Sequence, residues 1–429
     1  MKILIVGGGG REHALTWALS KDRNVEEVYA APGNPGIAEI GTCIPIASNN
    51  SNELASFASK NGIDLTVVGP EAPLSEGIVD TFKKQNLPIF GPDKQSARIE
   101  TSKSFAKDLC TRYALPTPRW ETFTDRTKAN RALDELGPPW VIKADGLAAG
   151  KGTTVTRDRR EAEAAIQREL LREPRRIVME EFIDGWEASF TATVSADRVQ
   201  WLAPVFQDYK PAYDGDSGPN TGGMGVYTPV PSVTQSLFEK VRKKILDPAA
   251  TALAKEGAPF RGVLYLNVIV KHGTEDPYVL EFNARFGDPE AQGIMPLVKG
   301  GLFAHLSAVA ANSDRAPIPE SSKSASVVVV LASRGYPENP STGDPVTLRP
   351  SGSSNIVVFH AGTARNSNGE LVTAGGRVLS VTATGPSVES ARNDVYSVIG
   401  KSVDFPGMHY RTDIGSDQIR RRQLEPIKT

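Results

Sequence analysis

The sequence has little cysteine, no long hydrophobic run near its start and no excess of either charge. Its two cysteines, Cys43 and Cys110, show no CxxC spacing and no His-rich neighbour, which argues against a disulfide framework and a structural zinc site. The first apolar run, Ile3–Val6, is too short for a signal peptide or a bilayer span. Lys and Arg number 49 against 50 Asp and Glu, so no basic field exists to hold a nucleic-acid backbone. We therefore expect a cytoplasmic protein with no membrane or nucleic-acid partner, in which local groups bind any anionic ligand.

Length and periodicity predict several packed domains. At roughly 150 residues per domain, 429 residues correspond to about three. Over 1–101, short apolar runs alternate with helical patterns, which is typical of an open parallel α/β sheet covered on both faces. We expect strands at 2–6, 28–30, 65–68 and 88–90, and helices at 12–20, 52–60 and 75–85.

The pattern changes after residue 101. A strand–glycine loop–strand unit replaces the strand–loop–helix unit, which predicts a flap between antiparallel strands and therefore an α+β region. We expect strands at 140–144, 152–156, 176–180, 262–270 and 277–282, and helices at 102–113 and 160–171. Residues 207–231 are rich in Gly and Pro and read as a ligand-binding loop. After a linker at 317–324, a last α+β unit has strands at 327–331, 356–359 and 377–383 and a helix at 388–399.

The glycine-rich turn before the first helix is a candidate anion site. Gly9, Gly10, Arg11 and Glu12 follow a strand and open a helix, where free amides and the helix dipole favour a phosphate. The dinucleotide fingerprint fits badly, because Glu12 or the following histidine takes the place of its third glycine. A turn needed only for tight strand-to-helix passage is the alternative.

Two further segments support a site at this sheet edge. Asn34 and Glu71 follow the second and third predicted strands, and open parallel sheets bind ligands at the carboxyl ends of their strands.

The segment IKADGLAAGKGT, residues 142–153, resembles a P-loop only superficially. Three residues separate Gly146 from Gly150 where that motif needs four, and neither Ser nor Thr follows Lys151. A flexible hairpin rich in backbone amides and flanked by Lys143 and Lys151 could still fold over a triphosphate. A plain hairpin with solvated lysines is the alternative.

An acidic segment follows the next apolar strand. The extended backbone at Glu180, Glu181 and Ile183 offers carbonyl and amide groups that suit an adenine edge, and Glu187 could accept ribose hydroxyls. Glutamates at a strand end are more often simply solvated, so this segment is weak evidence by itself.

The segment EFNARFGDPE, residues 281–290, carries the most specific chemistry. Glu281 and Asn283 are two residues apart on a predicted strand, so both oxygen-bearing side chains point to one face and suit Mg²⁺. Arg285 adds a cation on that face, and a turn places Asp288 close by. An edge strand with a polar face is the alternative.

These motifs, in this order, resemble the glycinamide ribonucleotide synthetase (phosphoribosylamine-glycine ligase) family of the ATP-grasp superfamily. The resemblance rests on GGREHA, PGNPG, VGPEAPL, IKADGLAAGKG, GPNTGGMG, RFGDPEAQ and HAGT, which together span nearly the whole chain. It implies a Rossmann-like phosphoribosylamine-binding domain at 1–101, an ATP-grasp domain at 102–296 with a mobile flap at about 116–190, and a small α+β domain at 325–429.

The resemblance also implies a reaction: ATP-dependent ligation of glycine to 5-phosphoribosylamine through a glycyl phosphate, in purine biosynthesis. It assigns Lys103, Lys143 and Lys151 to ATP phosphates, Glu180, Glu181 and Ile183 to adenine, and Glu187 to ribose. Glu281 and Asn283 would hold Mg²⁺ or Mn²⁺. Gly9, Gly10, Arg11, Glu12, Asn34 and Glu71 would bind phosphoribosylamine; Asn220, Thr221, Gly222, Gly223, Arg285 and Asp288 would lie where glycine meets the transferred phosphoryl group. Lys143, Arg285 and Asp288 are the catalytic candidates.

The chain departs from the family pattern in places. Where the family commonly has QDHKR, this sequence has Gln207-Asp208-Tyr209-Lys210-Pro211. Asn267 stands where a small residue is typical and is a further candidate for the metal shell. Alternatives to the family reaction are an ATP-grasp ligase for another phosphorylated amine, a nucleotide sensor without turnover and a dinucleotide-dependent oxidoreductase. We expect small-molecule partners only, and a monomer or weak dimer.

Overall fold

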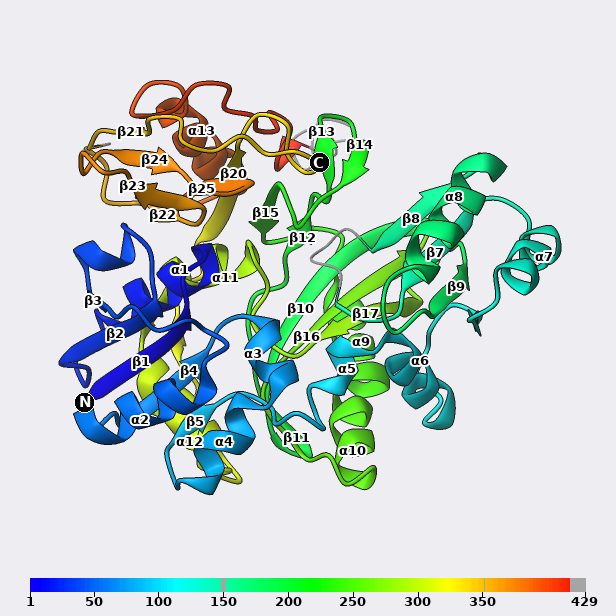
Figure 1. Ribbon diagram of the computed structural model, residues 1–429, viewed down its shortest axis with the longest axis horizontal. Helices are drawn as coiled ribbons and strands as arrows, with labels where there is room; N and C mark the ends of the chain where they lie inside the picture. The colour runs from blue at the N-terminus through cyan, green and yellow to red at the C-terminus, as the bar shows by residue number, and fades with distance from the viewer. Residues whose placement is uncertain (148–151, 351, 417–429) are drawn as a thin grey trace, which may run out of the picture.

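The structure of the protein is a computed structural model that describes residues 1–147, 152–350 and 352–416. Figure 1 shows an N-terminal region in blue, a C-terminal region in orange above it, and a flap that projects to the right. Strands β10, β16 and β17 run between these regions. No helix in the described part of the chain is long and apolar enough to cross a membrane.

The N-terminal region is a five-stranded parallel sheet in the order β3-β2-β1-β4-β5. Its strands are β1 (Lys2–Gly7), β2 (Glu27–Pro32), β3 (Thr42–Cys43), β4 (Leu65–Val68) and β5 (Ile89–Phe90). Its helical segments are α1 (Gly10–Leu19), η1 (Ile37–Glu39), α2 (Ser51–Asn61), α3 (Glu71–Glu76) and α4 (Ile78–Lys84). Ile3 to Val6 are fully buried, as an apolar central strand requires. The predicted open α/β fold is confirmed.

The helix predicted over 75–85 is two helices. Gly77 separates α3 from α4 with φ of +95°, a left-handed conformation that glycine adopts without strain. Its amide lies 3.1 Å from the carbonyl oxygen of Pro73, which closes the end of α3. The break leaves Glu71 as the first residue of α3, next to the carboxyl end of β4.

The flap is a four-stranded antiparallel sheet in the order β6-β9-β7-β8. Its strands are β6 (Trp120–Phe123), β7 (Trp140–Ala144), β8 (Thr153–Thr156) and β9 (Ile177–Glu181), with helices α7 (Arg126–Leu136) and α8 (Arg159–Leu170). Apolar side chains from both helices and from Ile142 and Met179 form one core cluster. The strand–loop–strand unit predicted for β7 and β8 is present.

The central region is an antiparallel sheet in the order β11-β10-β16-β17. Its strands are β10 (Gly185–Ala196), β11 (Arg198–Leu202), β16 (Phe260–Lys271) and β17 (Pro277–Asn283). The chain around them forms α5 (Arg98–Thr101), α6 (Lys103–Arg112), α9 (Gln235–Val241), η2 (Arg242–Leu246), α10 (Asp247–Lys255), α11 (Glu290–Ile294), η3 (Met295–Leu297), β18 (Val298–Gly300), α12 (Leu302–Ala310) and β19 (Glu320–Ser321). Strand β17 carries the predicted metal ligands at its end.

The C-terminal region is a five-stranded sheet in the order β12-β15-β20-β25-β22. Its strands are β12 (Gln207–Asp208), β15 (Gly225–Thr228), β20 (Ala325–Ala332), β22 (Ile356–His360) and β25 (Arg377–Gly385), covered by α13 (Val388–Val398). Smaller pairs are β13 (Pro211–Tyr213) with β14 (Ser217–Asn220), β21 (Thr347–Leu348) with β26 (Val403–Asp404), and β23 (Thr363–Arg365) with β24 (Leu371–Thr373).

Four of these strands, β12 to β15, correct the prediction for residues 207–231. The Gly- and Pro-rich segment was expected to be a loop, yet β15 is a buried strand that pairs with β20 about a hundred residues later. Its four residues are too few to show a strand pattern, and the partner that buries them is distant in sequence. The same segment still lines the functional cavity through Asn220, Thr221 and Gly222.

Candidate active site

A cavity of about 390 Å³ lies where the N-terminal, flap, central and C-terminal regions meet. Arg11 and Glu71 contribute from the N-terminal region, and Arg377 contributes from the C-terminal sheet. Of the other residues predicted from the motifs, the following also line the cavity: Lys103, Lys143, Glu180, Glu181, Ile183, Glu187, Asn220, Thr221, Gly222, Glu281, Asn283, Arg285 and Asp288. Most of the residues singled out by the motifs therefore share one cavity.

Glu281 and Asn283 occupy one face of β17, as their spacing predicts. Burial by itself would raise the pKa of the Glu281 carboxyl, but the ammonium groups of Lys210, Lys103 and Lys143 outweigh it and hold the pKa below its usual range. The Oδ1 atom of Asn283 accepts a hydrogen bond from Nη2 of Arg285 at 3.2 Å. An ionised carboxylate beside an amide oxygen is a hard donor set that suits a Mg²⁺ ion whose other ligands are phosphates and water.

Three lysines surround that carboxylate from three different segments. Lys103 begins α6 and donates to the Gly146 carbonyl at 3.2 Å, while Lys143 on β7 donates to the Leu280 carbonyl at 3.0 Å. Lys210 forms a 2.8 Å ion pair with Glu187. Because these cations converge from the flap, α6 and the 207–231 segment, they can neutralise a polyphosphate. Lys151, also predicted to bind ATP, lies outside the described residues.

The carboxylate of Glu180 lies between two buried ammonium groups. Its Oε1 is 2.9 Å from Nζ of Lys143, and its Oε2 is 2.9 Å from Nζ of Lys107. The side chain of Glu180 is thus committed to the two lysines. Sequence reasoning missed Lys107; its position four residues after Lys103 on α6, on the same helix face, was the available signal.

Burial lowers the pKa of Lys107 to about 8, although Glu180 opposes the shift. The neighbouring predicted residues also have protein partners. Glu181 pairs with Arg119 at 2.6 Å, and Glu187 accepts from Nδ2 of Asn267 at 3.0 Å as well as from Lys210.

Arg285 is held by a carboxylate that the sequence did not reveal. Its Nη2 lies 2.9 Å from Oε1 of Glu100, whose Oε2 accepts the Ala284 amide at 2.7 Å. Glu71 lies 3.4 Å from Nε of the same guanidinium. Burial raises the pKa of Glu100 even though Arg285 opposes the shift. Glu100 precedes Arg285 by 185 residues, so only the tertiary fold brings the two together.

Asp288 and the GPNTGG segment are joined by Arg377. One nitrogen of Arg377 donates to the carbonyl oxygens of Gly222 at 2.6 Å and Asp288 at 2.7 Å, and another lies 3.4 Å from the Asp288 carboxylate. Gln292 also donates to Asp288 at 2.7 Å. Burial would raise the pKa of Asp288, but Arg377 and Arg11 outweigh it, so this carboxylate stays ionised.

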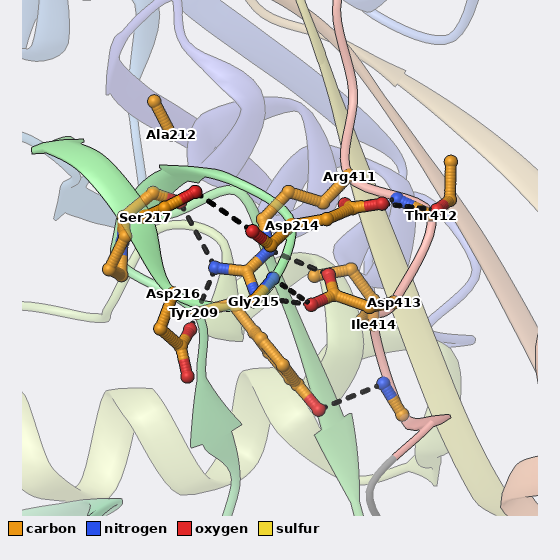
Figure 2. Close-up of polar contacts among 12 residues, drawn as sticks. Tyr209, Ala212, Asp214, Gly215, Asp216, Ser217, Arg411, Thr412, Asp413 and Ile414 are labelled. Atoms are coloured by element: carbon orange, nitrogen blue, oxygen red, sulfur yellow. Dashed lines mark hydrogen bonds and ion pairs between the residues drawn. The ribbon is translucent and has the colours of Figure 1, made fainter.

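The hairpin β13–β14, whose second strand carries the first three residues of GPNTGG, is clamped to residues 411–415 (Figure 2). Arg411 is fully buried and pairs with Asp413 at 2.6 Å and Asp216 at 2.8 Å, while its guanidinium lies 4.7 Å from the centre of the Tyr209 ring. It also donates to the Pro211 carbonyl at 3.1 Å. Tyr209 and Pro211, the two departures from the family pattern, are thus both contacts of Arg411. They are also the residues on either side of Lys210 in the sequence.

The predicted phosphoribosylamine residues divide into two groups. Arg11 and Glu71 line the cavity, with Arg11 donating to the Phe286 carbonyl at 2.9 Å. Glu12 instead accepts the Gly9 amide at 2.6 Å and Nε of Arg11 at 2.8 Å. Gly9, Gly10 and Glu12 are absent from the cavity wall, as is Gly223.

Asn34 joins two regions of the chain. Its amide nitrogen donates to the carbonyl oxygens of Gly8 and His360, both at 2.9 Å, and its oxygen accepts the Ile37 amide at 2.9 Å. It also lies outside the cavity wall. Its role as a substrate contact stays a prediction. Its bond to the His360 carbonyl connects the N-terminal region to the C-terminal region.

Comparison with known proteins matches the whole described architecture to one family. The models of the phosphoribosylglycinamide synthetase N domain, ATP-grasp (A) domain and C domain match residues 1–100, 101–291 and 326–417. Phosphoribosylamine–glycine ligases from Rhizobium meliloti and Listeria innocua are 42% and 43% identical, covering 98% and 97% of this chain and 99% of each relative.

Solved structures agree. A phosphoribosylamine–glycine ligase from Thermotoga maritima superposes with a TM-score of 0.81 at 35% identity, over 96% of this chain and all of that one. A biotin carboxylase from Campylobacter jejuni, at 14% identity, has a TM-score of 0.73 over 98% of this chain and 95% of that one, which shows a shared fold. The chain belongs to the phosphoribosylglycinamide synthetase family, with its three-domain architecture and central ATP-grasp domain.

Proposed function

We propose that the protein uses ATP to join glycine to 5-phosphoribosylamine, which yields glycinamide ribonucleotide, ADP and phosphate in purine biosynthesis. One observation carries the proposal. The oxygen pair Glu281 and Asn283, three lysines and the paired guanidinium of Arg285 line a single cavity, and the N-terminal region contributes Arg11 to it. The names of the relatives with more than 40% identity support the same substrates.

The nucleotide would occupy the flap side of the cavity. In this arrangement the backbone of the 180–183 segment would face the base and Glu187 would contact the ribose, which is supported by their presence in the cavity wall. Lys103, Lys143 and Lys210 line the same cavity and act on the Glu281 carboxylate, and they would neutralise the phosphates. Glu281 and Asn283 would hold Mg²⁺ or Mn²⁺, which supplies charge neutralisation at the terminal phosphates when bound.

The reaction needs an activated carboxylate, because oxide is not a leaving group for amide formation. An oxygen of the glycine carboxylate attacks the γ-phosphorus, the bond to ADP breaks, and glycyl phosphate forms. The neutral amine of phosphoribosylamine then attacks the carbonyl carbon, phosphate leaves, and the amine loses a proton to solvent. The contribution of Lys143 and Arg285 is to stabilise the developing charge and hold the reactants in line, which electrostatic groups in a closed site do effectively.

A covalent enzyme intermediate has no support in the cavity wall. Cys110 lines the cavity, but burial raises the pKa of its thiol to about 12, so the thiolate is absent at neutral pH. The direct transfer just described uses none of the chain's side chains as a nucleophile.

The amine substrate would enter the cavity from the side of the N-terminal region. Arg11 and Glu71 are the N-terminal residues that reach the cavity, and a ligase for another phosphorylated amine would use the same wall. We propose that the enzyme works in the cytoplasm on small-molecule substrates, as a monomer or weak dimer.

The decisive experiment is release of ADP from purified protein and Mg-ATP, with glycine or phosphoribosylamine omitted in turn. If the proposal is correct, ADP release reaches its full rate only with both glycine and phosphoribosylamine present. Mass spectrometry then identifies glycinamide ribonucleotide as the product. Equal rates with an unphosphorylated ribosylamine, or ATP binding without turnover, would contradict it.

A further inference from the structure

Strand β16 carries a single amide side chain in a buried, mainly apolar run. Asn267 is fully buried, and every residue of the run 264–270 is buried with it. In the sheet Asn267 pairs with Ser189 on β10 and with Glu281 on β17, so these three side chains share one face of the sheet. Glu281 places that face towards the cavity. The reaction described so far gives Asn267 no task.

Folding stability does not explain an amide at this position. The Oδ1 atom of Asn267 is buried and accepts no hydrogen bond from the described residues. A buried amide oxygen without a donor destabilises a fold, and an apolar side chain of similar size would avoid that cost. The reason for the amide therefore lies in what its nitrogen binds.

The side-chain nitrogen of Asn267 donates to Glu187. Its Nδ2 lies 3.0 Å from Oε2 of Glu187, and Nζ of Lys210 lies 2.8 Å from the same oxygen. Because Glu187 is two residues before Ser189 on β10, it is a diagonal neighbour of Asn267 across the two strands. An ionised carboxylate only accepts hydrogen bonds, so it fixes the amide with its nitrogen towards Glu187.

Two donors on one oxygen hold the Glu187 carboxylate in one orientation. Both bonds end on Oε2, whereas Oε1 accepts no hydrogen bond from the part of the chain that the structure describes. The side chain of Glu187 is 36% exposed, and the residue lines the cavity. Its second oxygen is thus available to a hydroxyl group of a ligand.

Lys210 supplies charge at this carboxylate, and Asn267 supplies direction. Desolvation would lower the pKa of Lys210, but the carboxylates of Glu187, Glu281 and Asp208 outweigh it and hold the pKa above its ordinary value. The ammonium therefore stays protonated and is attracted to several acids at once. The neutral amide adds a directed bond to Glu187 without a second positive charge.

We propose that Asn267 is a positioning residue that holds Glu187 for the ribose hydroxyls of the nucleotide. The inference rests on the proposed function, in which Glu187 contacts the ribose, and it names what makes that contact selective. A carboxylate fixed through one oxygen presents the other at a set place, and a site built to bind a hydroxyl rejects the analogue that lacks it. Asn267 thus favours a ribonucleoside triphosphate over a deoxynucleotide.

A direct role in the metal shell is the competing assignment, because Asn267 pairs with Glu281 across the strands. The two roles use different atoms of the amide. A metal ligand acts through Oδ1, so its loss changes the requirement for Mg²⁺. A positioning residue acts through Nδ2, so its loss changes the preference between sugars and leaves the requirement for Mg²⁺ unchanged.

The first test measures nucleotide binding, without turnover, in Asn267→Leu. Isothermal titration calorimetry gives the Kd for ATP, 2′-deoxy-ATP and 3′-deoxy-ATP in the presence of Mg²⁺. The Kd for ATP should rise about tenfold, the loss expected for one hydrogen bond to a charged group. In the wild-type protein at least one deoxynucleotide should bind about tenfold or more weakly than ATP, and in the variant that gap should fall to about threefold or less.

A positioning role and a structural role predict opposite changes in stability. The leucine removes a buried oxygen that has no donor, so the Tm of Asn267→Leu should equal or exceed that of the wild-type protein. Asn52→Leu, exposed on α2, is the matched control and should leave all three nucleotide affinities unchanged.

A second variant keeps the shape of the side chain. Asn267→Asp replaces the donor with an oxygen that repels Glu187, so it should weaken ATP binding at least as much as the leucine does. It stands in for the leucine variant if that protein fails to fold. Tighter binding of Mg-ATP by Asn267→Asp would identify a metal ligand and overturn the positioning role.

A double-mutant cycle links the effect to Glu187. In a Glu187→Ala background, Asn267→Leu should change the Kd for ATP less than about twofold, because the group that it positions is gone. A full loss of affinity in that background would show that Asn267 acts through another group, and it overturns the proposal.

The outcomes separate this proposal from the proposed function. A wild-type protein that binds ATP without glycine-dependent turnover overturns the proposed function, whereas the binding measurements still test Asn267. An unchanged preference between ATP and both deoxynucleotides in the Asn267 variants overturns the positioning role alone. A lower Tm of Asn267→Leu with equal losses for all three nucleotides would mean that the amide acts structurally, and it also overturns that role.

Discussion

At the scale of the residue, three glutamates of one cavity differ because their partners differ. Glu180 is neutralised by two lysines, and Glu100 is bound to Arg285 and a backbone amide. Glu281 faces three lysines, yet no protein hydrogen bond to its carboxylate is found in the described residues. Glu281 alone of these three is thus both ionised and available to a cation.

Glu281→Gln should lower kcat by roughly 10² to 10⁴, the cost of removing one electrostatic group from a preorganised site. The amide keeps the shape but loses the charge that holds Mg²⁺. Steady-state ADP release over a range of Mg²⁺ concentrations measures the effect. Glu121→Gln, exposed on β6, is the control, and near wild-type turnover of the cavity variant would refute the assignment.

Lys143→Ala should also lower kcat by roughly 10² to 10⁴ because it removes a phosphate-facing charge. It additionally leaves Glu180 with Lys107 as its one described ammonium partner. Single-turnover measurement of ADP formation separates slower chemistry from weaker ATP binding. A variant that loses ATP affinity and keeps its single-turnover rate would contradict a catalytic role.

Glu100→Gln should lower the free energy of unfolding by about 3 kcal/mol, because it leaves the buried guanidinium of Arg285 undercompensated. Glu71 still approaches Arg285, so the protein is expected to fold. Urea unfolding measures the change, with exposed Glu76→Gln on α3 as its comparison. Equal stabilities would show that Glu71 alone suffices.

Much of the site could be predicted at this scale. The spacing of Glu281, Asn283 and Arg285 on a strand is a local property, so sequence alone placed them on one face. Glu100 and Lys107 could not be found this way. Their importance comes from partners on other elements, and no local pattern records those contacts.

At the scale of the element, the hairpin β13–β14 depends on the segment that clamps it. Arg411 donates to the Pro211 carbonyl and to Asp216, while the amide and the hydroxyl of Thr412 both donate to the Asp214 carboxylate. The Asp413 carboxylate also accepts the Gly215 amide at 2.9 Å. These bonds link the C-terminal region to the chain on both sides of Lys210 and the GPNTGG segment.

Arg411→Lys should loosen the hairpin, because an ammonium cannot reproduce the forked contacts with two carboxylates and a carbonyl. We expect faster proteolysis near Tyr213, which is 49% exposed, and a lower kcat/KM. Limited proteolysis followed by mass spectrometry locates the cut. Arg365→Lys, exposed on β23, serves as the control; an unchanged cleavage rate at the hairpin would show that the other bonds are sufficient.

Element prediction succeeded where the pattern was local and failed where it was not. Strands β4 and β7 lie at the residues predicted, because both are short, mostly apolar runs bounded by turn residues. Strand β15 was missed, since its burial comes from β20. The single helix predicted over 75–85 failed at Gly77, where a left-handed residue ends one helix and allows another to start.

At the scale of the whole molecule, the N- and C-terminal regions meet through two buried histidines. The His360 amide donates to Nδ1 of His13 at 2.8 Å, and the two rings are 5.6 Å apart. Burial lowers the pKa of His13 to about 3 and that of His360 to about 4, from ordinary values of 6.5. Both rings therefore stay neutral in the folded protein at pH 6.

The free energy of unfolding should fall as pH decreases from 6.5 towards 4. In this window the unfolded chain binds protons that the folded chain does not, so the slope is up to about 1.4 kcal/mol per pH unit for each histidine. Above pH 6.5 this contribution is constant. Urea unfolding at pH 7.5, 6 and 5 measures the slope.

The variant that tests this pH dependence is His13→Asn. The asparagine side chain retains an acceptor for the His360 amide, and it does not titrate. It should reduce the loss between pH 7.5 and 5, whereas His272→Asn, at a side chain 57% exposed, should not. If His13→Asn unfolds with the wild-type pH dependence, the loss has another source.

The position of Arg377 late in the sequence affects when the cavity can form during synthesis of the chain. The residue that joins Asp288 to Gly222 is translated after every other cavity-lining residue of the described chain. A ribosome that has finished the nucleotide-binding strands has consequently not yet made a working pocket. A chain that stops before strand β25 lacks Arg377 and therefore the bonds that join Gly222 to Asp288 at this side of the cavity.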